Sequence, residues 1–366
     1  PIILERGEEA ERRQKTVENF WKNGVLDSES NVQFGEGGAG TFSDGKLNTL
    51  VKDPYGRNHE VLKRFVAAGA PEEIIYQQKP HLGTDVLVGI VEKMRHEIEE
   101  MGGKFCFRSK VTDLIFENNT LKEIEINNDK RIPAQVCVLA PGHSARDTFE
   151  MLEKRNINMT AKSFAVGLRL EHPQSFINYN AYGDSAYKMP AADYKVTYQT
   201  EAGRGVYSFC MCPGGYVVNA SSEKNMLAVN GMSYSGRNSG NANSAIIVTV
   251  TPDDYGNNGA LAGMYYQREL EKLAYRYGDG NVPVQLLGDF RQDRISTGFG
   301  SVTPNIKGSY SFANLRNVLG TTISDSISEG VKGFAKHIKG FDMEDAVFSG
   351  VESRTSSPVR IIRNEN

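Results

Sequence analysis

The sequence has 366 residues, of which 39% are hydrophobic and 24% charged, as in an ordinary globular protein with one large domain or two. A net charge of -3 does not favour nucleic-acid binding, and no apolar run is long enough for a membrane-spanning helix. We expect neither a nucleic-acid partner nor a membrane. Four cysteines without a disulfide pattern suggest a reducing compartment, and we expect a cytoplasmic protein.

The chain opens on "PIILERG", in which an apolar run ends at Glu5. This pattern predicts a buried parallel strand over residues 2–4, followed by a helix over residues 8–23. Such a strand needs neighbours on both sides, so we expect the sequence to begin partway through a fold. At the end of the second strand of a nucleotide-binding sheet, an acid accepts hydrogen bonds from ribose hydroxyls, which makes Glu5 a candidate. The alternative is an ordinary surface turn.

The next segment, "GEGGAGTFSDGKLNT" (35–49), combines glycines with ordered polar residues. The glycines let the backbone pass close to a flat or phosphorylated ligand, and successive amides here could hold an anion. Thr41, Ser43 and Asp44 add short polar groups, and Lys46 adds a positive charge. We expect a binding segment, with a loop that holds no ligand as the alternative.

Residues 83–101 have the apolar spacing of an amphipathic helix, with Thr84 and Asp85 as its cap and Gly102 at its end. From residue 104 the period changes to two, which predicts a three-stranded antiparallel meander. The meander feeds a buried strand, "AQVCVLAPG" (134–142), and a helix follows from Ser144. Ligands in such sheets bind beyond the carboxyl ends of the strands. We expect His143 to be a capping residue, with catalysis as the alternative.

The second half is dominated by strand-like segments over residues 163–250, which predict an antiparallel sheet. Helices are expected near residues 260–277 and 324–339. The fold class is therefore α/β with an α+β second domain. We expect a first domain over 1–161, a mainly antiparallel substrate domain over 162–345, and a strand in 346–366 that returns to the first domain.

Two further groups could carry chemistry. Strand alternation would place the thiols of Cys210 and Cys212 on one face, either as packed inert residues or beside a cofactor. This pair is too small for a structural zinc site, and we expect no metal. Near the end, "ESRTSSPVR" contains Arg354 and Arg360, which could bind a carboxylate or phosphate, although an ordinary edge strand is the alternative.

A family resemblance covers nearly the whole chain. The motifs "PIILERG", "GGAGTFSDGKLNT", "HLGTDVL", "VLAPGHSARD", "FAVGLRLEHPQ", "FCMCPGGYVVNASSE" and "ESRTSSPVR" occur in this order. They resemble the bacterial family of uncharacterised FAD-dependent (NAD(FAD)-utilizing) dehydrogenases, a branch of the two-dinucleotide-binding-domain flavoproteins. The resemblance implies an incomplete Rossmann-like FAD-binding domain with an inserted antiparallel-sheet substrate domain. The sequence lacks the family's N-terminal glycine fingerprint and its C-terminal FAD-closing segment.

The same resemblance implies a set of cofactor contacts. Glu5 matches the adenosine-ribose acid, with Arg6 beside it, and Val111 matches a main-chain contact to adenine. Ala140 and Gly142 match the strand-end turn beside the cofactor. The residues expected to follow the FAD chain toward the flavin are Gly38, Ala39, Gly40, Thr41, Ser43, Asp44, Gly45, Lys46 and Leu47.

We therefore expect a FAD-dependent oxidoreductase that transfers hydride between flavin and an unidentified small substrate or NAD(P)H. Lys46, Arg354 and Arg360 are candidates to orient an anionic substrate or stabilise reduced flavin, and Cys212 is a candidate redox participant. The main alternative is a non-catalytic FAD-binding protein that senses redox state. A weaker one is an FAD-dependent enzyme that modifies nucleic acid. We also expect this stretch of chain, expressed alone, to bind FAD poorly.

Overall fold

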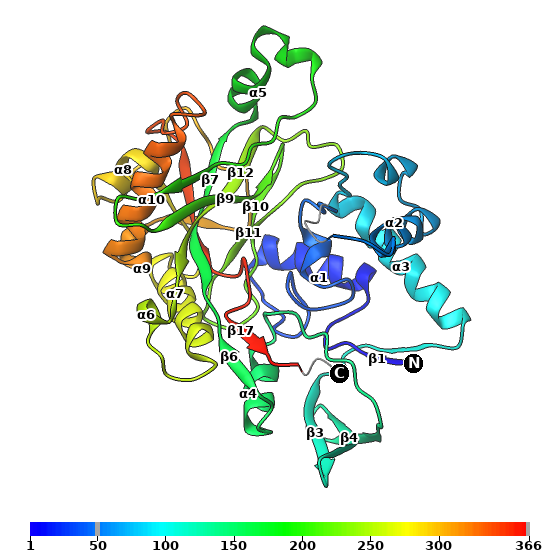
Figure 1. Ribbon diagram of the computed structural model, residues 1–366. Helices are drawn as coiled ribbons and strands as arrows, with labels where there is room; N and C mark the ends of the chain where they lie inside the picture. The colour runs from blue at the N-terminus through cyan, green and yellow to red at the C-terminus, as the bar shows by residue number, and fades with distance from the viewer. Residues whose placement is uncertain (48–51, 364–366) are drawn as a thin grey trace.

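The computed structural model describes residues 1–47 and 52–363 and has a mixed α/β architecture, which confirms the predicted fold class. In Figure 1 the long helices of the N-terminal third lie on one side of the molecule, and a large sheet with its own helices lies on the other. Trp21, Asp44 and Asp85 of the N-terminal part form hydrogen bonds with residues of the sheet-rich half. Asn48 and Thr49, the last residues of the predicted binding segment, lie outside the described residues, as do residues 364–366 of the expected return strand.

The chain begins with β1 (Ile2–Leu4), which pairs in parallel with β2 (Lys104–Cys106). The parallel strand is confirmed, but its predicted burial is wrong, because Ile2 is 59% exposed. Among the described residues β2 is the one strand that pairs with β1, so the other edge of β1 is uncovered.

Three helices follow β1: α1 (Ala10–Asn23), α2 (Arg57–Ala67) and α3 (Thr84–Glu100). The predicted helices at α1 and α3 are confirmed, as is the end of α3 at Gly102, which has φ +86°. The predicted cap of α3 is wrong, because its first turn has no side-chain cap. Asp85 instead accepts hydrogen bonds from the backbone N and the Oγ of Ser235, at 2.8 and 2.6 Å, and so joins α3 to the sheet-rich half.

The antiparallel meander is confirmed as β3 (Val111–Glu117), β4 (Thr120–Ile126) and β5 (Lys130–Pro133). The buried strand predicted over residues 134–142 is wrong: the segment forms no strand, and Val136 and Val138 are 85% and 86% exposed. Cys137 packs against the hydrophobic cluster that contains Leu114 and Phe149, but no described strand pairs with this stretch. An apolar run without a hydrogen-bonding neighbour cannot form a sheet. Helix α4 (Arg146–Lys154) follows.

The second half is built on a seven-stranded sheet with strand order β15-β13-β16-β7-β12-β9-β8. Its pairs are antiparallel except for β13 and β15. The strands are β7 (Phe164–Pro173), β8 (Thr197–Gln199), β9 (Gly205–Cys212), β12 (Asn241–Val250), β13 (Val282–Leu286), β15 (Tyr310–Phe312) and β16 (Val347–Glu352). Because β16 lies between β13 and β7, this sheet includes residues from the expected return segment.

Two long helices cover the sheet. Helix α7 (Ala262–Tyr277) contacts β13 and β16, and α10 (Thr321–Phe334) contacts β8, β9 and β12 (Figure 1). The prediction that α10 would reach residue 339 is wrong. After Phe334 the chain turns, with the amides of His337 and Ile338 both donating to the Phe334 carbonyl. Ile338 still packs against the main core, which explains its helical spacing.

The remaining elements connect these parts. Strand β17 pairs with β6, and β11-β10-β14 form a small sheet. None of the helices described is long and apolar enough to cross a membrane. The remaining elements are η1 (Ala39–Phe42), η2 (Glu72–Ile75), η3 (Gly183–Lys188), α5 (Gln174–Tyr182), α6 (Pro252–Tyr255), α8 (Leu287–Arg291), α9 (Arg316–Leu319), β6 (Met159–Ala161), β10 (Tyr216–Asn219), β11 (Val229–Met232), β14 (Ile306–Lys307) and β17 (Val359–Ile361).

Candidate functional site

Glu5 lies directly after β1 and joins it to the glycine-rich segment. Its Oε1 accepts hydrogen bonds from the backbone amides of Gly7 at 2.8 Å and Gly35 at 3.0 Å. A side chain at Gly7 would come within 2.5 Å of the Gly35 Cα, so this close approach requires glycine. Within the described chain the side-chain hydrogen bonds of Glu5 all fall on Oε1, which leaves Oε2 able to accept from another donor.

Arg6 is held by acids from two other segments. Its guanidinium donates to Glu29 at 2.8 Å and to both Asp147 oxygens at 2.8 and 2.9 Å, and it lies over the Phe34 ring. Burial opposes the charged form, but the ion pairs with Asp147 and Glu29 raise the pKa of Arg6. Through these ion pairs the Arg6 side chain links the end of β1 to helix α4.

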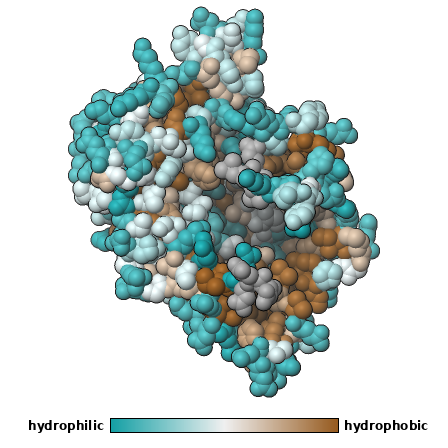
Figure 2. Space-filling view, in the orientation of Figure 1, coloured by the Kyte–Doolittle hydropathy of each residue, from teal (hydrophilic) through white to brown (hydrophobic). Residues whose placement is uncertain are grey.

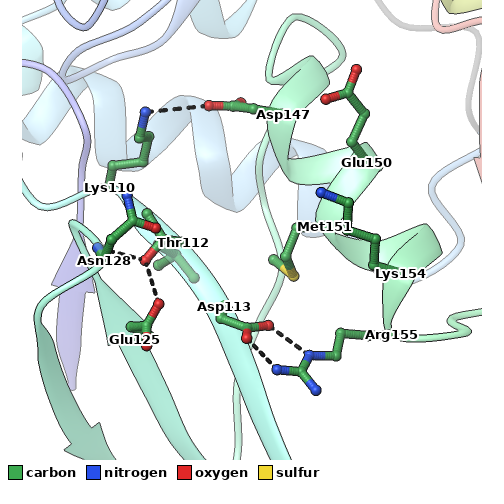
Figure 3. Close-up of a pocket in the computed structure, with 11 residues that line it drawn as sticks. Lys110, Thr112, Asp113, Glu125, Asn128, Asp147, Glu150, Met151, Lys154 and Arg155 are labelled. Atoms are coloured by element: carbon green, nitrogen blue, oxygen red, sulfur yellow. Dashed lines mark hydrogen bonds and ion pairs between the residues drawn. The ribbon is translucent and has the colours of Figure 1, made fainter.

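A polar groove of about 540 Å³ opens beside the Arg6–Asp147 ion pair, between β3, β4 and α4 (Figure 3). Lys110 spans one end of it, 3.5 Å from Asp147, and the Asp113–Arg155 ion pair spans the other. Val111, the residue that the resemblance assigns to an adenine contact, lines this groove. A groove with one aliphatic residue and alternating charges can hold a polar ring system.

The glycine-rich segment turns through η1 with its backbone open on one side. Gly38 has φ +63°, a conformation that favours glycine. A Cβ at Gly38 or Gly40 would meet no atom within 4 Å, so the main chain there faces open space. The hydroxyl of Thr41 is buried without a hydrogen-bond partner. Ser43 holds the turn, since its Oγ donates to the Gly40 carbonyl at 2.7 Å.

The turn after residue 139 offers a second open backbone. Ala140 and Gly142 are exposed, and Gly142 has φ +66° with open space at its Cβ position. Nδ1 of the neighbouring His143 is buried and has no partner. Burial, together with the charges of Arg354 and Arg146, lowers the pKa of His143 to about 4. His143 is therefore neutral near pH 7 and can act as a hydrogen-bonding group.

At the far end of the glycine-rich segment, Asp44 and Lys46 meet the sheet-rich half. The buried Asp44 carboxylate accepts two hydrogen bonds from Arg237, at 3.1 and 2.5 Å, and lies 2.8 Å from the Lys46 Nζ. The same Nζ donates to the carbonyl of Met211. Burial opposes the ammonium, but the neighbouring thiol pair and the Asp44 carboxylate raise the pKa of Lys46, which keeps it charged.

Cys210 and Cys212 lie beside this lysine at the end of β9. The predicted simple alternation is wrong here, because the pairing of β9 with β12 shifts register at this point and Cys210 has φ +48°. Both thiols nevertheless lie close to Lys46 and to Arg169 of β7. The sequence motif "CMC" indicated the pair, but the bulge that shapes it has no sequence signal.

The structure does not bring Arg354 and Arg360 together. Arg354 is 8% exposed and donates to both oxygens of the buried Glu271, at 2.9 and 2.7 Å. Arg360 is exposed on β17. Arg146 donates to the same Glu271 from the other side, at 2.9 and 2.7 Å. Arg146, Glu271 and Arg354 therefore form a buried ion triad. The sequence predicted that Arg354 would bind an anionic ligand, but Glu271 occupies its guanidinium.

Sequence reasoning missed Arg237, which fixes Asp44, and it gave Arg169 no role in the site. The one available signal for Arg169 was a charged residue inside an otherwise apolar strand, "FAVGLRLEH". Arg237 carried no signal, because it meets Asp44 across 193 residues of sequence.

Comparison with known proteins gives one family match and one close relative. Residues 163–355 match the family model "FAD-dependent protein, C-terminal domain-like". An uncharacterized protein of Clostridium beijerinckii (strain ATCC 51743 / NCIMB 8052) is 51% identical over 369 residues, which cover 100% of this chain and 69% of the relative.

Solved structures give much weaker likenesses. Tetracycline destructase Tet(51) is 10% identical with a TM-score of 0.23, and the match covers 50% of this chain and 41% of that one. PqsL, a probable FAD-dependent monooxygenase from Pseudomonas aeruginosa, is 11% identical with a TM-score of 0.25, covering 72% and 66%. The halogenase PltM is 10% identical, also at 0.25, covering 72% and 49%. TM-scores this low support no argument.

The family model covers 193 residues (355 − 163 + 1), which is more than half of the 366-residue chain. The Clostridium relative extends the sequence similarity over the rest. The chain therefore belongs to the family of FAD-dependent proteins that share this C-terminal domain.

Proposed function

We propose that this protein is a FAD-dependent oxidoreductase, in which FAD follows residues 35–47 from Glu5 to Lys46. Family membership supports the cofactor class. The observation that carries the proposal is the hydrogen bond from the Gly35 amide to Glu5, because it places the strand-end acid directly beside the start of the glycine-rich segment. In the space-filling view, the surface is hollowed between the N-terminal part and the sheet-rich half of the molecule (Figure 2).

The residues present fit a bound dinucleotide. The backbone has open space at Gly38, Gly40 and Gly142, where side chains would otherwise project. Two buried polar atoms, Thr41 Oγ1 and His143 Nδ1, have no hydrogen-bond partner among the residues that the structure describes. Buried polar groups are nearly always hydrogen-bonded, so these atoms suggest a ligand with polar groups of its own.

At the adenosine end, Glu5 Oε2 would accept a hydrogen bond from a ribose hydroxyl, while the two backbone amides fix the other oxygen. Arg6 would act through the fold, because Asp147 and Glu29 occupy its guanidinium. The groove lined by Val111 would receive the adenine, with the Val111 side chain as an aliphatic wall.

At the other end, FAD would supply two-electron redox chemistry, and the protein would supply orientation and charge. Lys46 stays protonated and is fixed by Asp44, so its ammonium can orient an anionic substrate or balance negative charge on reduced cofactor. Cys212 is the neighbouring candidate for redox chemistry. Arg360 remains available to an anionic substrate, whereas Arg354 positions the Glu271 triad next to His143.

We further propose the dehydrogenase reaction type, with hydride passing between flavin and NAD(P)H or a small substrate. A small molecule is the proposed partner in preference to nucleic acid, because the net charge is -3. The cytoplasm is the proposed compartment, since the four cysteines are all free thiols in the structure.

An anaerobic titration tests this function. The full-length protein that contains this chain, incubated with FAD and freed of excess FAD, should retain flavin absorbance bands that bleach on addition of NADH or NADPH and return with an electron acceptor. Retained bands that neither nucleotide bleaches would favour a non-catalytic flavin-binding role. If no flavin is retained at all, the proposed function is wrong.

A further inference from the structure

Cys210 and Cys212 form an unusual thiol pair at the end of β9. Cys212 is fully buried, and Cys210 is partly exposed. The strand pairing with β12 shifts register beside them, between Asn243 and Ala245. The pair therefore lies in a bulge, a feature that often re-aims side chains near functional sites.

The backbone at Cys210 adopts a left-handed conformation, with φ +48°. Non-glycine residues rarely adopt this conformation, and such strain persists only where the surroundings fix it. Here the surroundings are specific. Arg169 Nη2 donates to the Cys210 carbonyl at 2.9 Å, and Lys46 Nζ donates to the carbonyl of Met211 between the two cysteines.

Two positive charges thus converge on one Cys-Met-Cys turn. The guanidinium of Arg169 lies 3.5 Å from the Cys212 sulfur, and Lys46 reaches the turn from a different segment of the chain. The Cys212 thiol donates toward the backbone carbonyl of Cys210 at 3.4 Å, which holds Cys212 against the Cys210 main chain. The titratable and charged groups that face the Cys210 thiol are Cys212, Lys46, Arg169, Asp44 and Glu352.

These neighbours shift the pKa values of the two thiols in opposite directions. A hydrogen bond from Cys212, followed by the charges of Lys46 and Arg169, lowers the pKa of the Cys210 thiol. The same hydrogen bond and its burial raise the pKa of Cys212. A partly exposed thiolate beside a buried thiol is the arrangement of an attacking and a resolving cysteine.

We propose that Cys210 and Cys212 are a redox-active dithiol whose substrate class is a small disulfide, with Cys210 attacking and Cys212 resolving. The Cys210 thiolate attacks one sulfur of the substrate, whose S–S bond breaks and releases one thiolate. Cys212 then gives up its proton to solvent and attacks the Cys210 sulfur, which releases the second thiolate. The cysteine pair loses two electrons, and the substrate gains them as two thiols.

This inference goes beyond the flavin proposal and does not depend on it. Every group involved belongs to the chain, and the test uses protein freed of flavin. A failure of FAD binding would leave the thiol chemistry unaffected. Conversely, inert thiols would leave the flavin proposal intact.

Competitive alkylation with iodoacetamide, read by mass spectrometry of peptides, is the first experiment. Cys106 and Cys137 are also partly exposed and serve as internal controls. At pH 7, Cys210 should be modified at least tenfold faster than either control, because only the thiolate reacts. Equal rates at the three cysteines would overturn the proposal.

A pair of lysine variants tests the origin of this reactivity. Lys46→Met removes a cation beside the thiol pair and should raise the Cys210 pKa of about 6 by about one unit, which slows alkylation of Cys210 at pH 5 by about tenfold. Lys79→Met is the matched control, because Lys79 pairs with Asp193 on the surface. Its alkylation rate at Cys210 should equal that of the natural protein. An unchanged rate in Lys46→Met would contradict the assigned role of that charge.

Reaction with hydroxyethyl disulfide tests the second step. The natural protein should end with an internal disulfide, its mass lower by two hydrogens, and should release two equivalents of mercaptoethanol. Cys212→Ser should stop at a mixed disulfide on Cys210, and Cys210→Ser should not react at Cys212. A mixed disulfide that persists equally in the natural protein would show that the pair does not close.

Discussion

Glu271 holds two guanidiniums at once, in a place that water does not reach. Burial by itself would raise its pKa, but Arg146 and Arg354 outweigh burial and hold the pKa of Glu271 well below the ordinary carboxyl value. Its side chain is fully buried, and Ser353 Oγ donates a further hydrogen bond to it at 2.6 Å. The triad joins α4, α7 and the segment after β16, so we expect it to contribute to stability.

Glu271→Gln should lower the free energy of unfolding at pH 7 by roughly 3–5 kcal/mol, because it leaves two buried guanidiniums with no carboxylate. Glu269→Gln is the matched control: its exposed pair with Lys272 should contribute less than about 1 kcal/mol. Urea unfolding followed by circular dichroism measures both. Equal losses in the two variants would show that the triad carries no special stability.

The triad also predicts a direction of acid sensitivity. A depressed pKa in the folded state contributes stability that is present above the ordinary carboxyl value and lost as the pH falls below it. Glu271→Gln should therefore lose less stability than the natural protein between pH 5 and the acid limit of folding. If the free energy of unfolding falls equally in the two proteins over this acid range, this assignment is contradicted.

Residue types near the glycine-rich segment were predictable, but their partners were not. The sequence indicated Asp44 and Lys46 as polar groups on a binding segment, and both meet other charged groups there. Arg146 and Glu271 lie 125 residues apart. Neither has a local pattern that marks it, since an ion pair formed by tertiary packing leaves no spacing in the sequence.

At the scale of elements, β7 carries a buried carboxylate through the middle of the large sheet. Oε2 of Glu171 accepts hydrogen bonds from Asn241 Nδ2 at 2.9 Å and the Asn305 amide at 2.8 Å, while Oε1 has no partner. Burial raises the pKa of Glu171 to about 7, and the same cause raises that of Glu352 on β16 to about 7. Both strands therefore bear carboxyls that resist ionisation.

These raised pKa values predict a loss of stability as the pH rises. Each carboxyl contributes stability that is fully present below its unfolded value of 4.5 and is lost by about pH 7. A rise of this size corresponds to roughly 3 kcal/mol for one group. The free energy of unfolding should fall between pH 5 and pH 8 in the natural protein. In Glu171→Gln this fall should be smaller by roughly 3 kcal/mol.

The measurement is urea unfolding of the natural protein and the variant at both pH values. Glu117→Gln, on the exposed end of β3, is the control and should leave the pH dependence unchanged. An identical pH slope in Glu171→Gln and the natural protein would show that Glu171 is ionised in the folded state.

Periodicity predicted the elements whose surroundings are local. Helices α1 and α3 and the meander follow from repeats of 3.6 and 2 residues, and the structure confirms them. The strand predicted over residues 134–142 is wrong because an apolar run reports the tendency to be buried, not the presence of a neighbouring strand. The bulge at Cys210 was hidden for a similar reason, since it depends on the register against β12.

At the scale of the whole molecule, separate contacts tie the N-terminal part to the small sheet and to the loop between β11 and β12. Asp85 bonds Ser235, Asp44 bonds Arg237, and the Trp21 indole donates to the Asn219 carbonyl at 2.9 Å. The sequence could predict an FAD-dependent family, but not these contacts, which fix where the two parts meet. The resemblance supplied the cofactor, and the family match agrees with its FAD-dependent character.

The central claim is that the glycine-rich segment and the strand-end acid hold one FAD molecule. Gly40→Leu tests this claim most directly, because a side chain at Gly40 meets no protein atom within 4 Å and should fill only the space assigned to the cofactor. Gly298→Leu is the matched control, an exposed loop glycine with equally open surroundings.

Fluorescence titration of the full-length protein with FAD should give tight, stoichiometric binding for the natural sequence and for Gly298→Leu. It should give at least a hundredfold weaker binding for Gly40→Leu, with the midpoint of thermal unfolding without FAD unchanged in all three. Equal FAD affinity in the three proteins, or none in the natural one, would contradict the account.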